Sequence, residues 1–433
     1  MLLIVMIIFV GFLLFGFPVL MAMGIGALLY ATVEGLPASL ISYSIFQALN
    51  SFPLIAGPLF ILMGTLVNEF GETERIYDFA RLLLRRGRGY TAKVNVIVSL
   101  IFSGISGSAV ADIGGLGQVE IRAMEGEGYT TAYAAALTSA SSTIGPMFPP
   151  SIPLIIYAVT AQISTLRALL AGALPALVIT LVLYIFVVLQ TPGKLPGVPA
   201  ARLQGRPDSD RDGENVSFSK AFGDAFPILL LIPLIITLML VGVFSPSEAG
   251  AFAVIYIIIL QVVRRTFSLK RLKRCLVETY KSIACIFMII AIAEFLTKVL
   301  TLEHFPELVT RWFTSITASP ITILLLINAM VLIIGMFMEM VSTLIILTPI
   351  LLVITNAIGV DPFHLGVILV FNLEIGMFTP PLGVGVYTVA KVGNVPPDKV
   401  FRELLTLYWP LLIALLIITF FPALSLWLPG LMD

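Results

Sequence analysis

The chain has 433 residues, of which 59% are hydrophobic and only 12% are charged, and its mean hydropathy is +1.06. This composition excludes a water-soluble globular protein, which needs far more polar surface for its size. Basic and acidic residues balance to a formal net charge of zero, so no general attraction to nucleic acid is expected. We therefore predict a membrane protein.

Hydropathy predicts an all-α polytopic protein with ten membrane spans and two further apolar hairpins. The first apolar run begins directly after Met1 without a basic region, which predicts a retained span and not a cleaved signal peptide. The predicted spans are 2–15, 18–34, 52–70, 131–160, 165–190, 219–243, 246–264, 275–300, 363–391 and 399–428.

Between the third and fourth spans, residues 72–90 have the pattern of an amphipathic helix that lies in the membrane interface. Ile76, Phe79 and Leu83 are expected to form its apolar face, with charged residues between them. Two roles fit this pattern equally: a surface anchor, or a connector between a moving and a static domain.

The predicted hairpins are residues 94–121 and 320–356. Each is apolar at both ends and has a polar or acidic centre, at 103–108 in the first hairpin and at 338–340 in the second. A re-entrant hairpin needs small or polar residues at its tip, because its turn exposes backbone groups at membrane depth. The alternative is a pair of ordinary spans with polar kinks.

The chain repeats itself once, and one constant offset in numbering, which carries Gly145 onto Gly376, relates the two copies. We call it the repeat offset. The stretch 144–150 matches 375–381, and each contains a glycine followed by two adjacent prolines. The repeat offset also relates Gly104 to Gly335 and Glu72 to Glu303.

The paired glycines and prolines predict where the helices end. Because proline removes an amide donor and glycine loosens the backbone, we expect the helices to break at 144–150 and at 375–381. Broken helices at matching positions of two halves are typical of a transport site near the middle of the membrane.

The halves are predicted to be inverted repeats, 1–190 and 218–433, each with five spans, a re-entrant hairpin and a broken helix. Residues 191–217 are rich in Pro, Gly, Asp and Arg, which predicts a cytoplasmic linker. Five basic residues lie in 81–93, whereas the equivalent window of the second copy, 312–324, has none. The positive-inside rule then places the first hairpin toward the cytoplasm and the second toward the periplasm.

The tip of the first hairpin is the first candidate site. Hydroxyl and carbonyl oxygens of Ser106, Gly107 and Ser108, followed by Asp112, are suited to binding Na⁺ or to hydrogen-bonding an anion. The amides at the start of the second arm also favour a carboxylate. The alternative is a Gly/Ser motif that only allows close packing of membrane helices.

The two breaks are the second candidate site, because a proline pair leaves carbonyl groups without helical partners that can coordinate a cation. The residues expected to contribute are Ser141, Ser142, Thr143, Gly145, Pro149, Pro150 and Ser151 in the first half, and Asn372, Gly376, Thr379, Pro380 and Pro381 in the second. Three intramembrane acids, Asp112, Glu339 and Glu374, form a third set, since ionisable groups inside a bilayer are costly. A buried structural pair is the alternative for any one of them.

Enzymatic functions have little support in the sequence. The chain contains no Gly-x-Ser-x-Gly, His-Glu-x-x-His or Walker A motif. The two cysteines, Cys275 and Cys285, have no metal-ligand spacing. Without a nucleotide site, the energy for transport must come from an ion gradient or from the gradient of the substrate itself.

Several motifs resemble the large membrane subunit of TRAP transporters, the DctM-like permease, and the resemblance runs from the first span to the end of the chain. They are SGSAVAD at 106–112, FPPSIP at 148–153, GMFME at 335–339, TPPLG at 379–383 and FPALSLWLP at 421–429. The resemblance implies an elevator-type secondary transporter of the bacterial inner membrane that imports an organic anion, a carboxylate or a sulfonate, with Na⁺. It also implies two partners, a small four-span membrane subunit as a separate chain and a periplasmic substrate-binding protein, with lipid around the complex.

The resemblance also implies two groups of Na⁺ ligands and no organic cofactor. The groups are Ser106, Gly107 and Ser108 with Ser142, Thr143 and Gly145, and Met338, Glu339 and Ser342 with Gly376 and Thr379. We expect the organic anion at Ser106, Ser108, Asp112, Pro149, Pro150, Thr379, Pro380 and Pro381. Three alternatives remain: a Na⁺-coupled anion carrier that needs no binding protein, an anion channel and an intramembrane enzyme.

Overall fold

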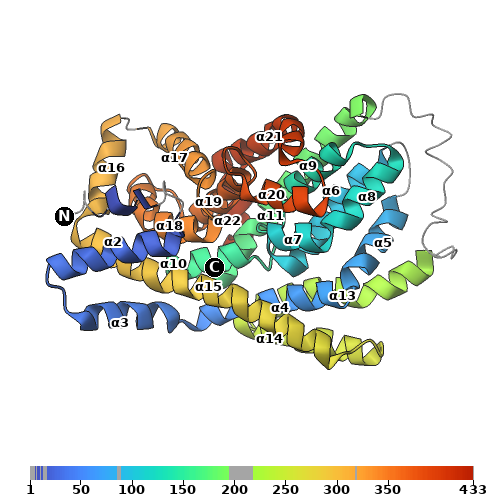
Figure 1. The fold of residues 1–433 in the computed structure, drawn as a ribbon, viewed down its shortest axis with the longest axis horizontal. Coiled ribbons are helices and arrows are strands. Elements are labelled where there is room, and N and C mark those ends of the chain that lie inside the picture. Colours follow the sequence, from blue (N-terminus) through green and yellow to red (C-terminus); the bar gives the residue numbers. More distant parts are fainter. Residues whose placement is uncertain are drawn as a thin grey trace.

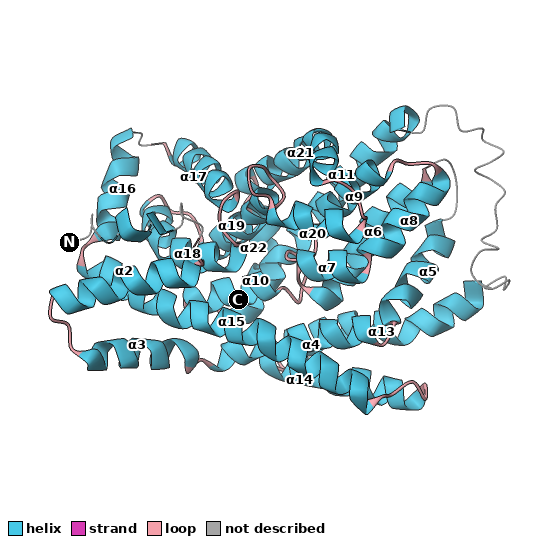
Figure 2. Ribbon diagram, viewed as in Figure 1, coloured by secondary structure: helices cyan, strands magenta, loops and turns pink. Residues whose placement is uncertain are grey.

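The computed structural model describes residues 17–84, 89–194, 218–316 and 319–432, together with positions 5, 7–9, 11 and 12. These residues form helices joined by turns and short loops, with no β-strand among them (Figure 2). The prediction of an all-α protein is confirmed. Most of the predicted span 2–15, and the predicted linker from residue 195 onward, lie outside the described residues.

Each half of the chain forms a series of helices of very different lengths. The first half contains α2 (Val19–Val33), α3 (Ala38–Leu49), the 3₁₀ turn η1 (Phe52–Ile55), α4 (Ala56–Glu69), α5 (Glu72–Leu84), α6 (Tyr90–Ser106), α7 (Ala109–Gly115), α8 (Gly117–Glu127), α9 (Thr131–Ser142), α10 (Ile152–Thr160) and α11 (Thr165–Lys194). The second contains α13 (Phe218–Leu240), α14 (Pro246–Val263), α15 (Leu269–Leu302), α16 (Phe305–Ile316), α17 (Pro320–Gly335), α18 (Met340–Ala357), α19 (Pro362–Met377), α20 (Val384–Val392), α21 (Pro397–Phe420) and α22 (Ala423–Gly430).

Seven helices of the described residues are long and apolar enough to cross a membrane. Six coincide with predicted spans, and the seventh is α18, the second arm of the predicted hairpin 320–356. The prediction of a polytopic membrane protein is confirmed. The helix α3 was not among the predicted spans.

Both predicted helix breaks are present. The helix α9 ends at Ser142 and α10 begins at Ile152, while α19 ends at Met377 and α20 begins at Val384. The new helix of the first break starts with a good cap, because the Ser151 hydroxyl accepts a hydrogen bond from the Leu154 amide at 3.2 Å.

The first hairpin bends sharply at its predicted tip. The helices α6 and α7 meet at an angle of 115°. Gly107 makes this bend with φ of 57°, a left-handed conformation that glycine adopts at little cost. In the second hairpin, α17 and α18 are joined by the turn 336–339.

One layer of long helices supports the breaks and hairpins. The helices α3, α4, α13, α14 and α15 run along one long side of the molecule, and the broken helices and hairpin arms lie on the other side (Figure 1). The helix α15 packs against α2, α3 and α4, and α14 packs against α4. The halves also interlock at the breaks, because α10 packs on α18 and α20 packs on α7.

The repeat offset also appears in the helix boundaries. It carries Thr131 onto Pro362, so α9 and α19 begin at equivalent positions. It carries Ala38 onto Leu269, so the continuous helix α15 corresponds to α3 and α4, which η1 separates. The opposite orientation of the two copies stays a prediction.

Three expected boundaries were wrong. The helix α11 continues through Lys194, so the first residues of the predicted linker are helical. The predicted span 399–428 is two helices, α21 and α22, because Pro422 between them lacks an amide donor. The helix α5, expected over 72–90, is described over Glu72–Leu84, and Leu83 is 54% exposed, whereas Ile76, Tyr77 and Ala80 are buried. The buried face of α5 therefore includes Tyr77 and not Leu83, which we expected in its apolar face.

Candidate functional site

The tip of the first hairpin is bonded to the first break. The Ile152 amide, just after the two prolines, donates to the Gly107 carbonyl at 3.4 Å. A Cβ atom on Gly107 would lie 2.5 Å from the Pro150 carbonyl oxygen, so only glycine fits this approach. The fold thus brings together two motifs that lie far apart in the sequence.

Asp112 lies directly beneath this tip. Its Oδ1 accepts a hydrogen bond from the Ser106 hydroxyl, and both side chains are buried. A Cβ atom on Gly145 would lie 2.7 Å from Asp112 Oδ2, so the missing side chain lets the carboxyl group approach the break. Three residues that we selected from the sequence are therefore neighbours.

Two hydroxyl groups at the first break donate hydrogen bonds to carbonyl groups of their own helix, α9. Ser142 donates to the Ser139 carbonyl at 2.8 Å, and Thr143 donates to the Ala140 carbonyl at 2.7 Å. Each oxygen keeps lone pairs that can accept another bond or a cation.

The tip of the second hairpin differs from the sequence expectation in one respect. Glu339, which we expected as an intramembrane acid at this tip, is exposed on the surface of the chain, unlike Asp112 and Glu374, which are buried. Its Oε2 accepts hydrogen bonds from the Ser342 amide at 2.9 Å and the Ser342 hydroxyl at 3.1 Å. The side chain is thus the N-cap of α18. Met338 beside it is half-buried.

The second hairpin touches its break through two glycines. A Cβ atom on Gly376 would lie 2.8 Å from the backbone carbon of Gly335, so α17 and α19 cross without intervening side chains. Thr379 donates to the Ile375 carbonyl at 2.7 Å. These residues pair a hairpin with a break, as Gly107 and Pro150 do in the first half.

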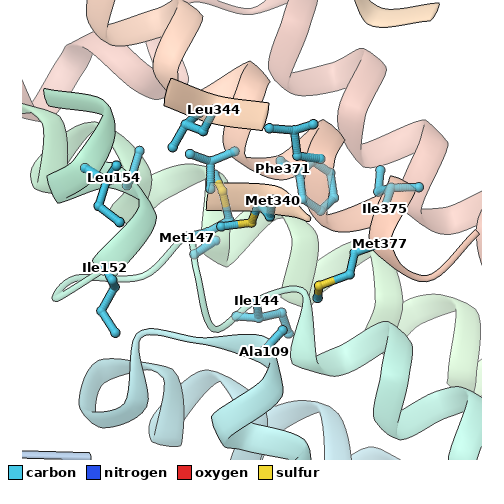
Figure 3. Close-up of a cluster of buried hydrophobic side chains, with 14 of the residues drawn as sticks. Ala109, Ile144, Met147, Ile152, Leu154, Met340, Leu344, Phe371, Ile375 and Met377 are labelled. Carbon is cyan, nitrogen blue, oxygen red and sulfur yellow. The ribbon is translucent and has the colours of Figure 1, made fainter. Parts of the chain in front are cut away.

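We call the contact between each hairpin and its helix break a junction. The two junctions differ in how exposed their prolines are. Pro149 and Pro150 are buried, whereas Pro380 and Pro381 are exposed. Between the junctions lies an apolar cluster to which both halves contribute, including Ala109 and Met340 at the hairpins (Figure 3). The arrangement is therefore closed at one junction and accessible at the other.

Three buried acceptor oxygens near the junctions have no hydrogen-bond donor: Asp112 Oδ2, Asn372 Oδ1 and Glu374 Oε2. Asp112 and Glu374 are close enough to interact electrostatically. Among the described residues, no three His, Cys, Asp or Glu side chains form a group that could hold a metal ion. A cation bound here would need hydroxyl, amide and backbone oxygens in addition to these acids.

Sequence reasoning missed a polar network in each half. In the first half, the Ser141 hydroxyl donates to Asn95 Oδ1 at 2.7 Å, and Asn95 Nδ2 donates to Glu120 Oε2 at 2.9 Å. In the second half, Asn372 Nδ2 donates to Asn328 Oδ1 at 2.8 Å.

The repeat itself carries a signal that could have found these networks. The first arm of each apolar hairpin contains an asparagine, Asn95 in one and Asn328 in the other. Their partners on the broken helices, Ser141 and Asn372, are equivalent positions under the repeat offset. Asn95 and Asn328 are two positions apart under the repeat offset, but each is a polar residue in an apolar arm, which is costly in a membrane and therefore indicates a polar contact.

Comparison with solved structures shows that the chain shares its fold with known membrane transporters. The YdaH transporter of Alcanivorax borkumensis superimposes with a TM-score of 0.64 at 14% identity, over 89% of each chain. MtrF of Neisseria gonorrhoeae superimposes with a TM-score of 0.59 at 12% identity, over 89% of this chain and 83% of that one. The chain therefore has the fold of a class of polytopic membrane transporters.

The sequence matches the family described as the tripartite ATP-independent periplasmic transporter, DctM component, over residues 6–424. The sialic acid TRAP transporter large permease protein SiaM of Vibrio cholerae is 37% identical, over 88% of this chain and 87% of SiaM. The C4-dicarboxylate large permease protein DctM of Pseudomonas aeruginosa is 33% identical, over 90% and 89%. The isethionate permease protein DctMQ of Oleidesulfovibrio alaskensis is 32% identical, over 98% of this chain and 65% of DctMQ. The chain belongs to the DctM family of TRAP transporter large permease proteins.

Membership defines the chain as the large permease component of a tripartite transporter. The family implies a small membrane subunit, a periplasmic binding protein and a location in the bacterial inner membrane. The relatives are transporter permeases and not enzymes.

Proposed function

We propose that this chain couples the import of an organic anion, a carboxylate or a sulfonate, to the entry of Na⁺. The small membrane subunit, a separate four-span chain, and a periplasmic binding protein would deliver the anion to it. The relatives named for sialic acid, C4-dicarboxylates and isethionate support this class of substrate.

The observation that carries the Na⁺ proposal is the set of buried acceptors without donors. Asp112 Oδ2, Asn372 Oδ1 and Glu374 Oε2 come from both halves and lie close to the two breaks. Buried polar atoms are normally paired, and an acceptor without a donor costs about 1–3 kcal/mol. A cation satisfies acceptors without supplying a proton, so Na⁺ fits this donor-poor region.

The unequal exposure of the two junctions supports transport by alternating access. Pro380 and Pro381 are exposed on this chain, whereas Pro149 and Pro150 are buried. In the proposed cycle, Na⁺ would bind near Asp112 and Glu374, and the anion would bind between the hairpin tips. Movement of the hairpins and breaks against α4 and α15 would then expose the other junction.

We expect an inward Na⁺ gradient to drive accumulation of the substrate in liposomes that contain both membrane subunits, with the binding protein outside. The assay uses radiolabelled sialic acid, a C4-dicarboxylate and isethionate in turn, with choline replacing Na⁺ as the control. Accumulation of one of them with choline or with a proton gradient alone would contradict Na⁺ coupling. Uptake by this chain without its partners would instead support an independent carrier.

A further inference from the structure

A buried carboxyl group below the first hairpin has no role in the proposed transport site. Glu120 lies in the first turn of α8 and is 1% exposed. Asn95 Nδ2 and the Thr138 hydroxyl both donate to its Oε2, at 2.9 and 3.3 Å. The other oxygen, Oε1, is buried and has no hydrogen-bond partner. Neither of these two donors is an expected Na⁺ ligand at the hairpin tips or breaks.

The donors around Glu120 are too few for an ionised carboxylate. Such a group has about four lone-pair directions to satisfy, but both neutral donors here serve the same oxygen. In the part of the chain that the structure describes, no ion pair involves Glu120. A buried charge without a counter-ion is strongly unfavourable and is normally neutralised.

The ionisable neighbours of Glu120 favour a proton further. Asp112 on α7 is a second buried acid that acts electrostatically on Glu120. On α5, Glu120 is the charged group that acts most strongly on Tyr77, whose buried hydroxyl also has no hydrogen-bond partner. The helices α6 and α9 contribute Asn95 and Thr138, and the Lys391 side chain on α20 is exposed.

We propose that Glu120 is a proton-binding site, in which a proton from bulk water converts the buried carboxylate to a neutral carboxylic acid. The proton on Oε1 turns an acceptor without a partner into a donor for a water molecule, and the Tyr77 hydroxyl, which also has no partner, can bind the same water. The site shares one neighbour, Asp112, with the proposed Na⁺ region, but neither hydrogen-bond donor to Glu120 is an expected Na⁺ ligand.

Infrared difference spectroscopy on the purified transporter tests the proposal without a substrate. The difference between wild type and Glu120→Gln at neutral pH should contain the carbonyl stretch of a protonated carboxylic acid, which shifts in heavy water. The matched control is Glu125→Gln, because Glu125 is an exposed carboxylate on the same helix. Its difference spectrum should contain carboxylate bands only.

Two outcomes would overturn the proposal. Carboxylate bands for Glu120 at neutral pH would show that it is ionised, and a shift of those bands when Na⁺ replaces choline would make it a cation site. The Gln variant is neutral and nearly isosteric, so its melting temperature should remain within a few degrees of wild type. Failure of Glu120→Gln to assemble while Glu125→Gln assembles would show that the negative charge is required.

Discussion

Replacement of Gly107 by alanine is expected to reduce transport by more than about tenfold. The left-handed backbone at this position costs a residue with a side chain about 1–2 kcal/mol. In addition, the new Cβ would lie 2.5 Å from the Pro150 carbonyl oxygen, which is backbone and cannot rotate away. Because about 1.4 kcal/mol corresponds to a factor of ten, separation of the tip from the break should be visible in the initial rate of uptake.

The matched control for this experiment is Gly114→Ala in the same hairpin. A Cβ atom on Gly114 would have no atom within 4 Å, and Gly114 lies in α7, where alanine is the better helix former. Uptake is compared in liposomes at equal protein amounts, together with melting temperatures. Equal transport by Gly107→Ala and Gly114→Ala would show that contact between tip and break is not needed.

Replacement of Glu72 by alanine is expected to cause a large loss of stability. Glu72 is fully buried, and its carboxylate pairs with Arg264 at 2.5 Å and with Arg75 at 2.9 Å. Gln261 also donates to it, at 2.8 Å. Removal of one partner of a buried ion pair typically costs about 3–5 kcal/mol, because the other charge is left unpaired. The melting temperature of the transporter should therefore fall by several degrees.

A double mutant separates loss of the pair from loss of packing. Glu72→Leu with Arg264→Leu should recover part of the stability lost in either single variant, because both buried partners are then apolar and the remaining Arg75 is 30% exposed to solvent. Glu74→Ala is the control, since Glu74 is exposed on the same helix. Strictly additive losses in Glu72→Leu and Arg264→Leu would rule out a coupled ion pair.

The acid of this ion pair, Glu72, also has a counterpart in the second copy of the repeat. Under the repeat offset, Glu303 is the counterpart of Glu72, and Gln261 is the counterpart of Tyr30. Glu303 acts electrostatically on the Tyr30 side chain, and Gln261 donates a hydrogen bond to Glu72. Tyr30 on α2 of the first half thus interacts with Glu303 of the second half, and Gln261 on α14 of the second half interacts with Glu72 of the first half. These interactions join the two copies.

The sequence predicted the helix breaks because their cause is local. Two adjacent prolines remove amide donors wherever they occur, and the glycines at Gly145 and Gly376 mark the same places. The bend at Gly107 was also local, since only glycine adopts the left-handed conformation cheaply. In contrast, α3 was missed because its serines and Gln47 weaken its hydropathy, although it packs on α15.

The site was predicted only as far as each residue's own chemistry allowed. Asp112 and Ser106 were selected as separate oxygen donors, and the structure shows that they bond to each other. The contact between Asn95 and Glu120 joins two different helices, and no periodic pattern encodes it. The exposure of Glu339 depends on how the second hairpin packs, which the turn sequence alone does not determine.

The opposite orientation of the two copies is the central requirement of the proposed transport cycle, and cysteine labelling tests it most directly. Arg122 and Ser319 are exposed and lie beside the first and second hairpins. Each is changed to cysteine in a Cys285→Ser background, because Cys285 is the exposed one of the two native cysteines and Cys275 is buried. A membrane-impermeant maleimide should label Ser319→Cys only from the periplasmic side and Arg122→Cys only from the cytoplasmic side. Labelling of both positions from the same side would contradict the inverted arrangement.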